Sequence, residues 1–441
     1  TSAFDFVFSG ESDLEFPSFC QAYLDENRLP ENPIVECGSI QEMDLTETPN
    51  YEDYLQQLSE YQQKNLLPKE LPSWLYFETS RGCWWGAKSH CTFCGLNALD
   101  MAYRRKSTKR ILEDIYLFKT KYQAKHLRAV DNIMPYEFHQ DVLPALSEQQ
   151  PKIKIFYEVK SNLKERDLDL FVTAGVKEVQ PGVESLSSNI LKLVGKGVSG
   201  IQNLWLLKNC LARGIYVYWN MLAGVPGETR ADYEGMLQIF PFIEHLQAPE
   251  GWGFIRLDRF SPYHSYSEKY GIVNVRPTPG YARIYPPSAD LYKIAYYFQG
   301  DYDTDLLKDS ALQKKVGDAL SHWKKRWEAT SRPKLYGYKV NEETWIVEDT
   351  RACSKTRYTP IFKEQVQLLK QLETFLPCSK VENTSILQEL IARHWVIQYE
   401  AHYINLVIQK PLPKSSLILT VLIGFGFISM TIVILYYSFV S

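Results

Sequence analysis

The hydrophobic pattern of the chain alternates between short apolar runs and longer segments in which apolar residues recur at helical spacing. A first strand is predicted at Trp74–Phe77, and five further strand-like runs follow it at Lys125–Val130, Lys154–Val159, Val176–Gln180, Ile215–Trp219 and Gly253–Leu257. Helical patterns lie between them at about 108–124, 136–150, 165–174, 200–213 and 230–246. This alternation predicts an α/β fold with a parallel sheet covered by helices, either an open sheet or a full or partial barrel.

Each predicted strand is followed by polar or glycine residues. Asp131-Asn132 follows the second strand, Glu184-Ser185 lies after the fourth, and Asn220 begins the loop after the fifth. Any one of these sequences is compatible with an ordinary turn. Six in succession predict a shared site, because the carboxyl ends of parallel strands meet at the same edge of the fold.

The segments on the amino-terminal side of this region have a different pattern. Residues 1–27 hold one strand-like run and one helical pattern, which cannot bury a core alone, so we expect the remnant of a larger α/β domain. Residues 28–71 are rich in Pro, Glu, Asn and Gln and predict a linker with a short helix at about 51–61. The alternating units occupy residues 72–265.

The carboxyl-terminal part is predicted to form a separate domain. Residues 266–411 are helical and aromatic in pattern, and Trp323 and Trp327 would share one face of a helix. An amphipathic helix at 386–394 followed by two strand-like runs is typical of a winged-helix-like module. Such a module could hold a peptide.

Residues 412–441 predict a membrane anchor. Leu417–Val440 is a run of 24 residues without a charge, which is long enough to cross about 30 Å of hydrocarbon as a helix. Lys410 and Lys414 precede it and no charge follows, so the positive-inside rule places the catalytic part in the cytoplasm. The alternative is a buried core helix, which two glycines and the lack of a polar face disfavour.

Composition excludes some functions. The 441 residues are 45% hydrophobic and 23% charged, which are values of a globular protein. A net charge of −3 gives no electrostatic footprint for nucleic acid, so we expect no nucleic-acid partner. Five of the eight cysteines are scattered and are expected to be reduced thiols; they are Cys20, Cys37, Cys210, Cys353 and Cys378.

The other three cysteines, Cys83, Cys91 and Cys94, lie within a dozen residues and predict a metal site. One interpretation is structural zinc with His90 as the fourth ligand. The other is a [4Fe–4S] cluster that leaves one iron open for a cofactor. S-adenosylmethionine (SAM) bound at such an iron can be cleaved to a 5′-deoxyadenosyl radical. The residues alone favour the cluster and leave both interpretations open.

Several motifs together resemble a known family. They are Gly82–Gly86, His90–Asn97, Val130–Ile133, Glu158–Leu163, Gln180–Leu186, Trp219–Glu228 and Leu257–Tyr263. The sequence resembles the radical SAM maturases of ribosomally made peptide natural products, in the B12-binding-domain group. The resemblance runs from about Phe4 to about Gln409. The spacing C-x7-C-x2-C is longer than the commonest radical SAM spacing, C-x3-C-x2-C.

The resemblance implies a partial (β/α)6 barrel and a set of site residues. Cys83, Cys91 and Cys94 would be the catalytic residues that bind the [4Fe–4S] cluster. The implied SAM-binding residues are Phe93 near the adenine, Asn132 in place of a glycine-rich strand end near the amino group, Glu184 and Ser185 at the ribose, Lys196 at the carboxylate, and Asn220 and Gly224 in the fifth-strand element that supports the adenine.

The resemblance also implies a reaction and partners. The expected activity is radical modification of a precursor peptide by C-methylation, with epimerisation or another radical modification as the alternative. The cluster would be reduced by an electron donor such as flavodoxin or ferredoxin. Cobalamin would be a further cofactor, but the Asp-x-His-x-x-Gly signature is absent and only a remnant of its domain is expected here. The competing function is a non-catalytic, zinc-stapled peptide-binding protein; a tRNA-modifying enzyme is disfavoured by the charge.

Overall fold

The computed structural model describes residues 4–68, 74–97, 100–150 and 152–411. The chain divides into two compact units. The first consists of the residues up to Ser199 together with Arg213–Asp232 and Pro249–Lys314, and the second of Gly200–Ala212, Tyr233–Ala248 and the residues from Lys315 onward. The predicted boundary at residue 265 therefore differs from the observed division.

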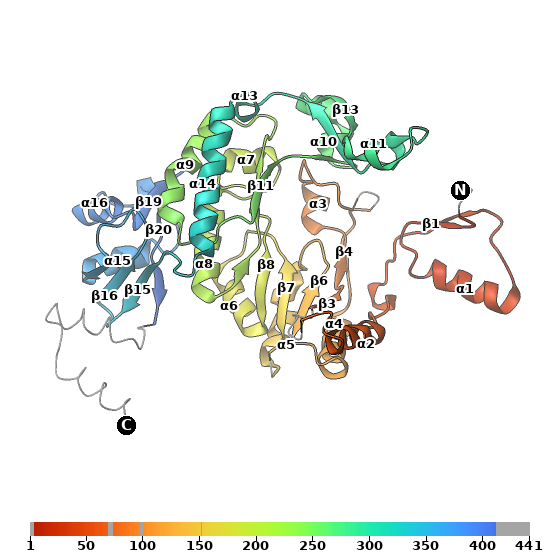
Figure 1. Ribbon diagram of the computed structural model, residues 1–441. Helices are drawn as coiled ribbons and strands as arrows, with labels where there is room; N and C mark the ends of the chain where they lie inside the picture. Colours follow the sequence, from red (N-terminus) through yellow and green to blue (C-terminus); the bar gives the residue numbers. More distant parts are fainter. Residues whose placement is uncertain (1–3, 69–73, 98–99, 151, 412–441) are drawn as a thin grey trace. The chain divides into compact units, whose positions relative to one another are not determined.

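A parallel sheet forms the centre of the first unit. Its strand order is β3-β6-β7-β8-β9, with bounds Trp74–Phe77, His126–Ala129, Lys154–Glu158, Val176–Gln180 and Tyr216–Val217. Strands β10 (Asn220–Ala223) and β11 (Gly251–Phe254) form a second parallel pair, and an isolated bridge between Glu184 and Met221 connects the end of β8 to β10. Figure 1 shows the central strands side by side. The predicted α/β fold is confirmed.

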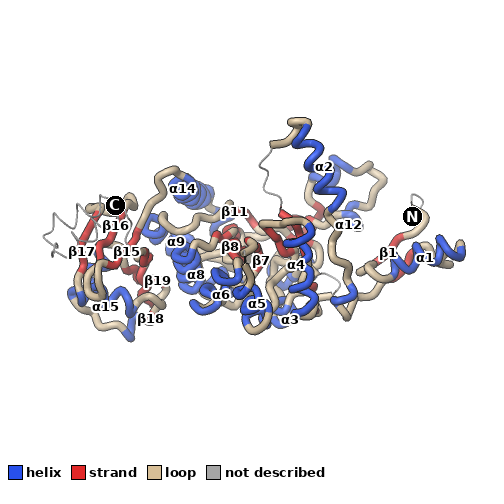
Figure 2. Tube along the Cα trace, turned by 90° about the horizontal axis from the view of Figure 1, so that it is seen from below, coloured by secondary structure: helices blue, strands red, loops and turns tan. Residues whose placement is uncertain are grey.

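Helices cover one face of this sheet because its side chains there are apolar. Helix α4 (Thr108–Lys121) is capped by Ser107 and buries Ile111, Ile115 and Phe118 at helical spacing. Phe118 packs edge-on against Phe77 of β3, with ring centroids 6.3 Å apart. Helices α5 (Val142–Glu148) and α6 (Glu165–Ala174) lie along β7 and β8 (Figure 2).

The fifth and sixth predicted strands are broken in the structure. The fifth, Ile215–Trp219, is reduced to β9 because the chain changes partner: the Tyr218 amide donates to the Val179 carbonyl, and the Leu222 amide donates to the Glu184 carbonyl. The sixth, Gly253–Leu257, ends early, and β12 (Leu257–Asp258) joins a different sheet. That sheet is antiparallel, in the order β12-β14-β13, with β13 at Val273–Pro277 and β14 at Tyr297–Asp301.

The amino-terminal segment is a small βαβ unit. Strand β1 (Val7–Ser9), helix α1 (Glu15–Glu26) and β2 (Ile34–Glu36) follow one another, and β1 and β2 pair in parallel. The interpretation of residues 28–71 as linker is therefore wrong for β2, whose three residues pair with a strand outside that range. The short helix predicted at about 51–61 is observed as α2 (Glu52–Gln63).

The remaining elements of the first unit are short. They are β4 (Ser80–Arg81), α3 (Trp84–Lys88), β5 (Arg104–Arg105), α7 (Ser188–Leu193), α10 (Pro262–Ser265), α11 (Gly280–Ile284), α12 (Leu291–Ile294), α13 (Asp305–Lys308) and 3₁₀ turns at Met43–Leu45, Tyr136–His139 and Ser267–Tyr270.

The second unit combines helices with two sheets. Its elements are most of α8 (Gly200–Arg213), α9 (Arg230–Ile243) and α14 (Ser310–Glu328), then β15 (Leu335–Lys339), β16 (Trp345–Asp349), β17 (Tyr358–Ile361), α15 (Lys363–Gln371), β18 (Leu376–Pro377), a 3₁₀ turn at Cys378–Lys380, α16 (Ser385–Ala392), β19 (Val396–Tyr399), β20 (His402–Asn405) and β21 (Ile408–Lys410). The strands pair in the orders β17-β16-β15-β21 and β18-β20-β19.

The structure both supports and corrects the prediction for residues 266–411. Helix α16 is followed by the hairpin β19–β20, as the pattern predicted. Trp323 and Trp327 both lie buried on α14. The expectation of a mainly helical region is wrong, because the chain there also forms the two sheets and β13–β14.

No helix in the described ranges is both long and apolar enough to cross a membrane. The predicted anchor, Leu417–Val440 within residues 412–441, lies outside the described residues.

A buried histidine should make the second unit sensitive to acid. Burial, helped by the nearby Arg351, lowers the pKa of His245 to about 3, while its Nε2 lies 3.1 Å from the Leu406 carbonyl oxygen. Below pH 6.5 the unfolded chain takes up a proton that folded His245 refuses, so the free energy of unfolding should fall by about 2 kcal/mol between pH 7 and pH 5. Denaturant titrations should show this loss reduced in His245→Gln, and unreduced in a variant of the exposed His322, His322→Gln.

Candidate functional site

The first of the three clustered cysteines begins a tight loop after β4. Cys83 caps α3, and its Sγ accepts a hydrogen bond from the Gly86 amide at 3.2 Å. Gly82 has φ +80°, and a Cβ there would lie 2.2 Å from the Ala102 carbonyl oxygen. A side chain at position 82 would therefore push the loop apart, so the glycine fixes where Cys83 starts.

The three thiols share one electrostatic environment. Burial raises the pKa of Cys94 to about 11 and also raises the pKa of Cys91, and the neighbouring thiols add to both effects. Among the residues that the structure describes, no three His, Cys, Asp or Glu side chains converge closely enough to surround a single ion. Cysteine thiolates are the usual ligands of iron–sulfur clusters, and Cys83, Cys91 and Cys94 supply three of them. The donor set fits a [4Fe–4S] cluster.

His90 supports the loop between the second and third thiols. Its Nε2 lies 2.8 Å from the carbonyl oxygen of Cys94, and the Cys94 amide donates to the Cys91 carbonyl at 3.0 Å. This contact matches a role for His90 in shaping the loop.

A partly buried ion pair lies beside the thiols. Lys196 Nζ is 3.0 Å from Glu184 Oε1, and the two side chains are 14% and 16% exposed. The ammonium is also 5.9 Å from the centre of the Phe93 ring. Burial alone would lower the pKa of Lys196, but the charges of Glu184 and Cys91 outweigh it and raise that pKa. The structure thus brings Phe93, Glu184 and Lys196 together with the cysteines.

The other predicted cofactor residues lie at strand ends and have roles in the fold. We name Cys83–Asn97 the cysteine loop. Asn132 Nδ2 donates to Asn97 Oδ1 at 2.7 Å, and this hydrogen bond connects the segment after β6 to the cysteine loop. Ser185 is fully buried, and its Oγ accepts from the Ser187 amide at 3.0 Å. Asn220 is exposed at the start of β10. SAM contacts by these residues stay predictions.

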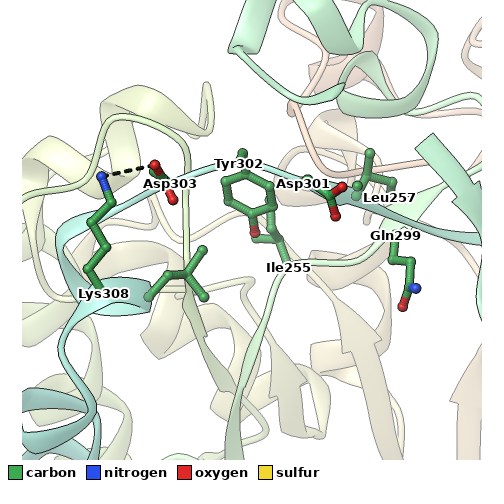
Figure 3. Close-up of a pocket in the computed structure, with 9 residues that line it drawn as sticks. Ile255, Leu257, Gln299, Asp301, Tyr302, Asp303 and Lys308 are labelled. Carbon is green, nitrogen blue, oxygen red and sulfur yellow. Dashed lines mark ion pairs between the residues drawn. The ribbon is translucent and has the colours of Figure 1, made fainter. Parts of the chain in front are cut away.

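Gly224, the last predicted cofactor residue, contacts a tyrosine that lines a cavity. Its φ is +66°, and its carbonyl accepts from the Tyr302 hydroxyl at 2.8 Å. Tyr302 also lines a cavity of about 480 Å³ (Figure 3). Asp301 and Asp303 line the same cavity, and Asp303 pairs with Lys308 at 3.0 Å. A role for Gly224 in binding adenine stays a prediction.

Sequence reasoning did not assign Lys160. This residue is only 6% exposed, and its ammonium lies 3.6 Å from the centre of the Trp85 ring. Burial, together with the positive charge of Lys196, lowers the pKa of Lys160 to about 8. Its place after β7 was visible in the strand-end pattern, but its burial depends on Trp85, which is distant in sequence.

Arg128 and Glu158 were also missed. They lie on the face of the sheet opposite the helix-covered residues Tyr157 and Val179. The Arg128 guanidinium is 3.8 Å from the centre of the Phe156 ring, and burial raises the pKa of Glu158 to about 7. Lys196 and Arg128 both act electrostatically on Glu158, so this polar face adjoins the thiol site.

The segment that holds this site matches a known family. Residues 77–240 match the family described as the Radical SAM superfamily. This segment is a radical SAM domain. The family implies SAM and a [4Fe–4S] cluster, and the three thiols lie inside the matched segment.

A curated relative matches a similar length. An "Uncharacterized methyltransferase" of Pyrococcus horikoshii is 24% identical over 164 residues, which cover 36% of this chain and 35% of that protein. The chain therefore aligns with about a third of that relative.

Solved structures show limited similarity. The cobalamin-dependent radical SAM enzyme OxsB with aqua-cobalamin is 17% identical, covers 65% of this chain and 44% of its own, and has a TM-score of 0.45. The radical SAM methyltransferase TsrM of Kitasatospora setae, with tryptophan and a SAM analogue, is 14% identical, covers 59% and 53%, and has a TM-score of 0.43. The chain spans about half the length of these proteins.

Loss of one thiol should remove the cluster. Because each cluster thiolate holds its own iron, Cys83→Ala, Cys91→Ala and Cys94→Ala should each lose most of the iron and sulfide bound after anaerobic reconstitution. Cys378→Ala, a variant in the second unit, should retain the wild-type content. Elemental analysis decides the matter: stoichiometric zinc without sulfide in the wild-type protein would contradict the cluster.

Proposed function

We propose that this protein is a radical SAM enzyme that modifies a ribosomally made precursor peptide, with C-methylation as its reaction. The observation that carries the proposal is the gathering of three thiols beside the partly buried Lys196–Glu184 pair, within a radical SAM domain. The methyltransferase name of the curated relative supports methyl transfer over epimerisation.

Each part of the site has a role in this proposal. Cys83, Cys91 and Cys94 would hold the cluster, which when bound supplies the electron that cleaves the sulfonium of SAM. Lys196 would hold the SAM carboxylate, because a buried ammonium binds that group strongly. Glu184 would then exchange part of its ion pair for a contact with the ribose hydroxyls.

The polar face of the sheet supports a substrate with amide or charged groups. Arg128 offers guanidinium donors, and Glu158 offers an acceptor when ionised. Within the described ranges no carboxylate lies within ion-pair distance of Arg128, and Glu158 likewise has no cation at that distance. Both groups therefore have hydrogen-bonding capacity for a peptide bound below the thiols. An electron donor of the flavodoxin or ferredoxin type would complete the reaction.

Reductive cleavage of SAM tests the chemistry directly. The reconstituted protein with dithionite and SAM should form 5′-deoxyadenosine, because the open iron is where the sulfonium would be reduced. Chromatography measures this product, and the Cys91→Ala protein is the control.

Mass spectrometry of a co-expressed peptide from a neighbouring gene then distinguishes the reactions. A gain of one methylene mass supports methylation, and dependence on added cobalamin would assign the methyl carrier. Deuterium uptake from solvent without methylation would identify epimerisation instead. A protein that forms no 5′-deoxyadenosine and binds the peptide through zinc would contradict the proposal.

Removing the polar groups of the sheet face should lower peptide modification without lowering SAM affinity. In Glu158→Gln and Arg128→Met, peptide modification should fall at least tenfold because a charged contact is lost, while SAM affinity stays within about twofold. Lys109→Met, a change of a side chain that is 85% exposed, is the control. Equal losses in SAM binding and peptide modification would show that these residues serve the cofactor instead.

A further inference from the structure

The turn that carries Lys196 is fastened to the cysteine loop. We name Val194–Gly197 the lysine turn. The Trp85 Nε1 donates to the Gly195 carbonyl at 3.2 Å, and the Thr92 amide donates to the Val194 carbonyl at 3.2 Å. Two residues between the cluster thiols therefore hold two consecutive carbonyls of the lysine turn.

Lys160, in the loop after β7, makes a further contact with the lysine turn. Its Nζ donates to the carbonyl of Lys196 while lying over the Trp85 ring at 3.6 Å. Lys160 is only 6% exposed, and burying a cation costs free energy unless polar or aromatic groups compensate it. Here the Lys196 carbonyl and the Trp85 indole face do so. The contact is therefore specific, since the ammonium would otherwise be better solvated at the surface.

Glycines allow the close packing that this contact requires. Gly195 and Gly197 have φ +69° and +66°, which side-chain-bearing residues rarely adopt. A Cβ at Gly197 would lie 2.3 Å from the Trp85 ring, so the indole rests on bare backbone. On the other side, a Cβ at Gly182 would lie 2.4 Å from Lys196 Nζ. The backbone of the turn and the end of the Lys196 side chain are both confined.

We infer that Lys160 is a positioning residue: with Trp85 it fixes the lysine turn, so that the Lys196 ammonium is presented beside the three thiols. Its link to cofactor binding rests on the proposed function, in which Lys196 holds the SAM carboxylate. Lys160 acts through the Lys196 backbone, whereas Glu184 acts on the Lys196 side chain. The cysteine loop and the lysine turn then order each other.

The first arm of the test needs neither cofactor. Hydrogen exchange of the protein before reconstitution should show the amides of Thr92 and Lys196 protected, because they donate to the carbonyls of Val194 and Leu191. Lys160→Met keeps most of the side-chain volume and removes the ammonium. Exchange at these amides should accelerate at least tenfold in this variant and stay unchanged in Lys164→Met, a change at an exposed neighbour.

The second arm measures SAM affinity of the reconstituted protein, by the change in the spectrum of the reduced cluster on titration. Lys160→Met should weaken SAM binding about tenfold and raise KM more than it lowers kcat, with iron content unchanged. Lys160→Arg should restore part of the affinity, because it keeps a cation and a donor. If Lys160→Met does not fold, Trp85→Phe replaces it, since that variant keeps the ring and removes the bond to Gly195.

The two arms separate the possible failures. A wild-type protein that binds no SAM would overturn the proposed function, and hydrogen exchange would still decide the role of Lys160. Unchanged exchange in Lys160→Met would overturn the inference. Weaker SAM binding with unchanged exchange would also overturn it, because Lys160 would then contact the cofactor directly.

Discussion

Charge balance among buried groups is the constraint on which the rest of the site depends. Lys160 lies in the loop after β7 and Lys196 in the turn between α7 and α8, and an ammonium at either place is stable only if neighbours compensate it. Glu184 compensates Lys196 as an ion pair, and Trp85 compensates Lys160 through its indole face. Thiols that lose their protons to a metal add negative charge beside both lysines. Metal binding and placement of the lysines therefore favour each other.

The regular part of the fold could be predicted because its signals are local in sequence. Strand Val176–Gln180 and helix Glu165–Ala174 have the predicted bounds, since alternation, helical spacing and Gly175 mark them within a few residues. The break in the fifth strand could not be predicted. It arises where the Tyr218 amide still bonds to β8 and the Leu222 amide bonds to Glu184, and this change of partner depends on a distant loop.

The candidate site shows the same distinction. The cysteine spacing predicted the metal-binding loop, and the family resemblance predicted roles for Glu184 and Lys196. No motif indicates the direction of the Ser185 hydroxyl, which accepts from Ser187 inside a turn. Lys160 was visible only as one polar residue in a strand-end sequence, because its burial is created by Trp85, 75 positions earlier in the chain.

Side chains alternate in direction along β7, so one strand contributes both to the core and to the polar face. Successive side chains of a strand point to opposite faces, so Tyr157 enters the helix-covered core while Phe156 and Glu158 face the other way. A shift of register by one residue would turn Glu158 toward the helices and Tyr157 toward the opposite face. The packing that stabilises the sheet thus also fixes that Arg128, Phe156 and Glu158 share one face, and this face cannot be altered in register without disrupting the core.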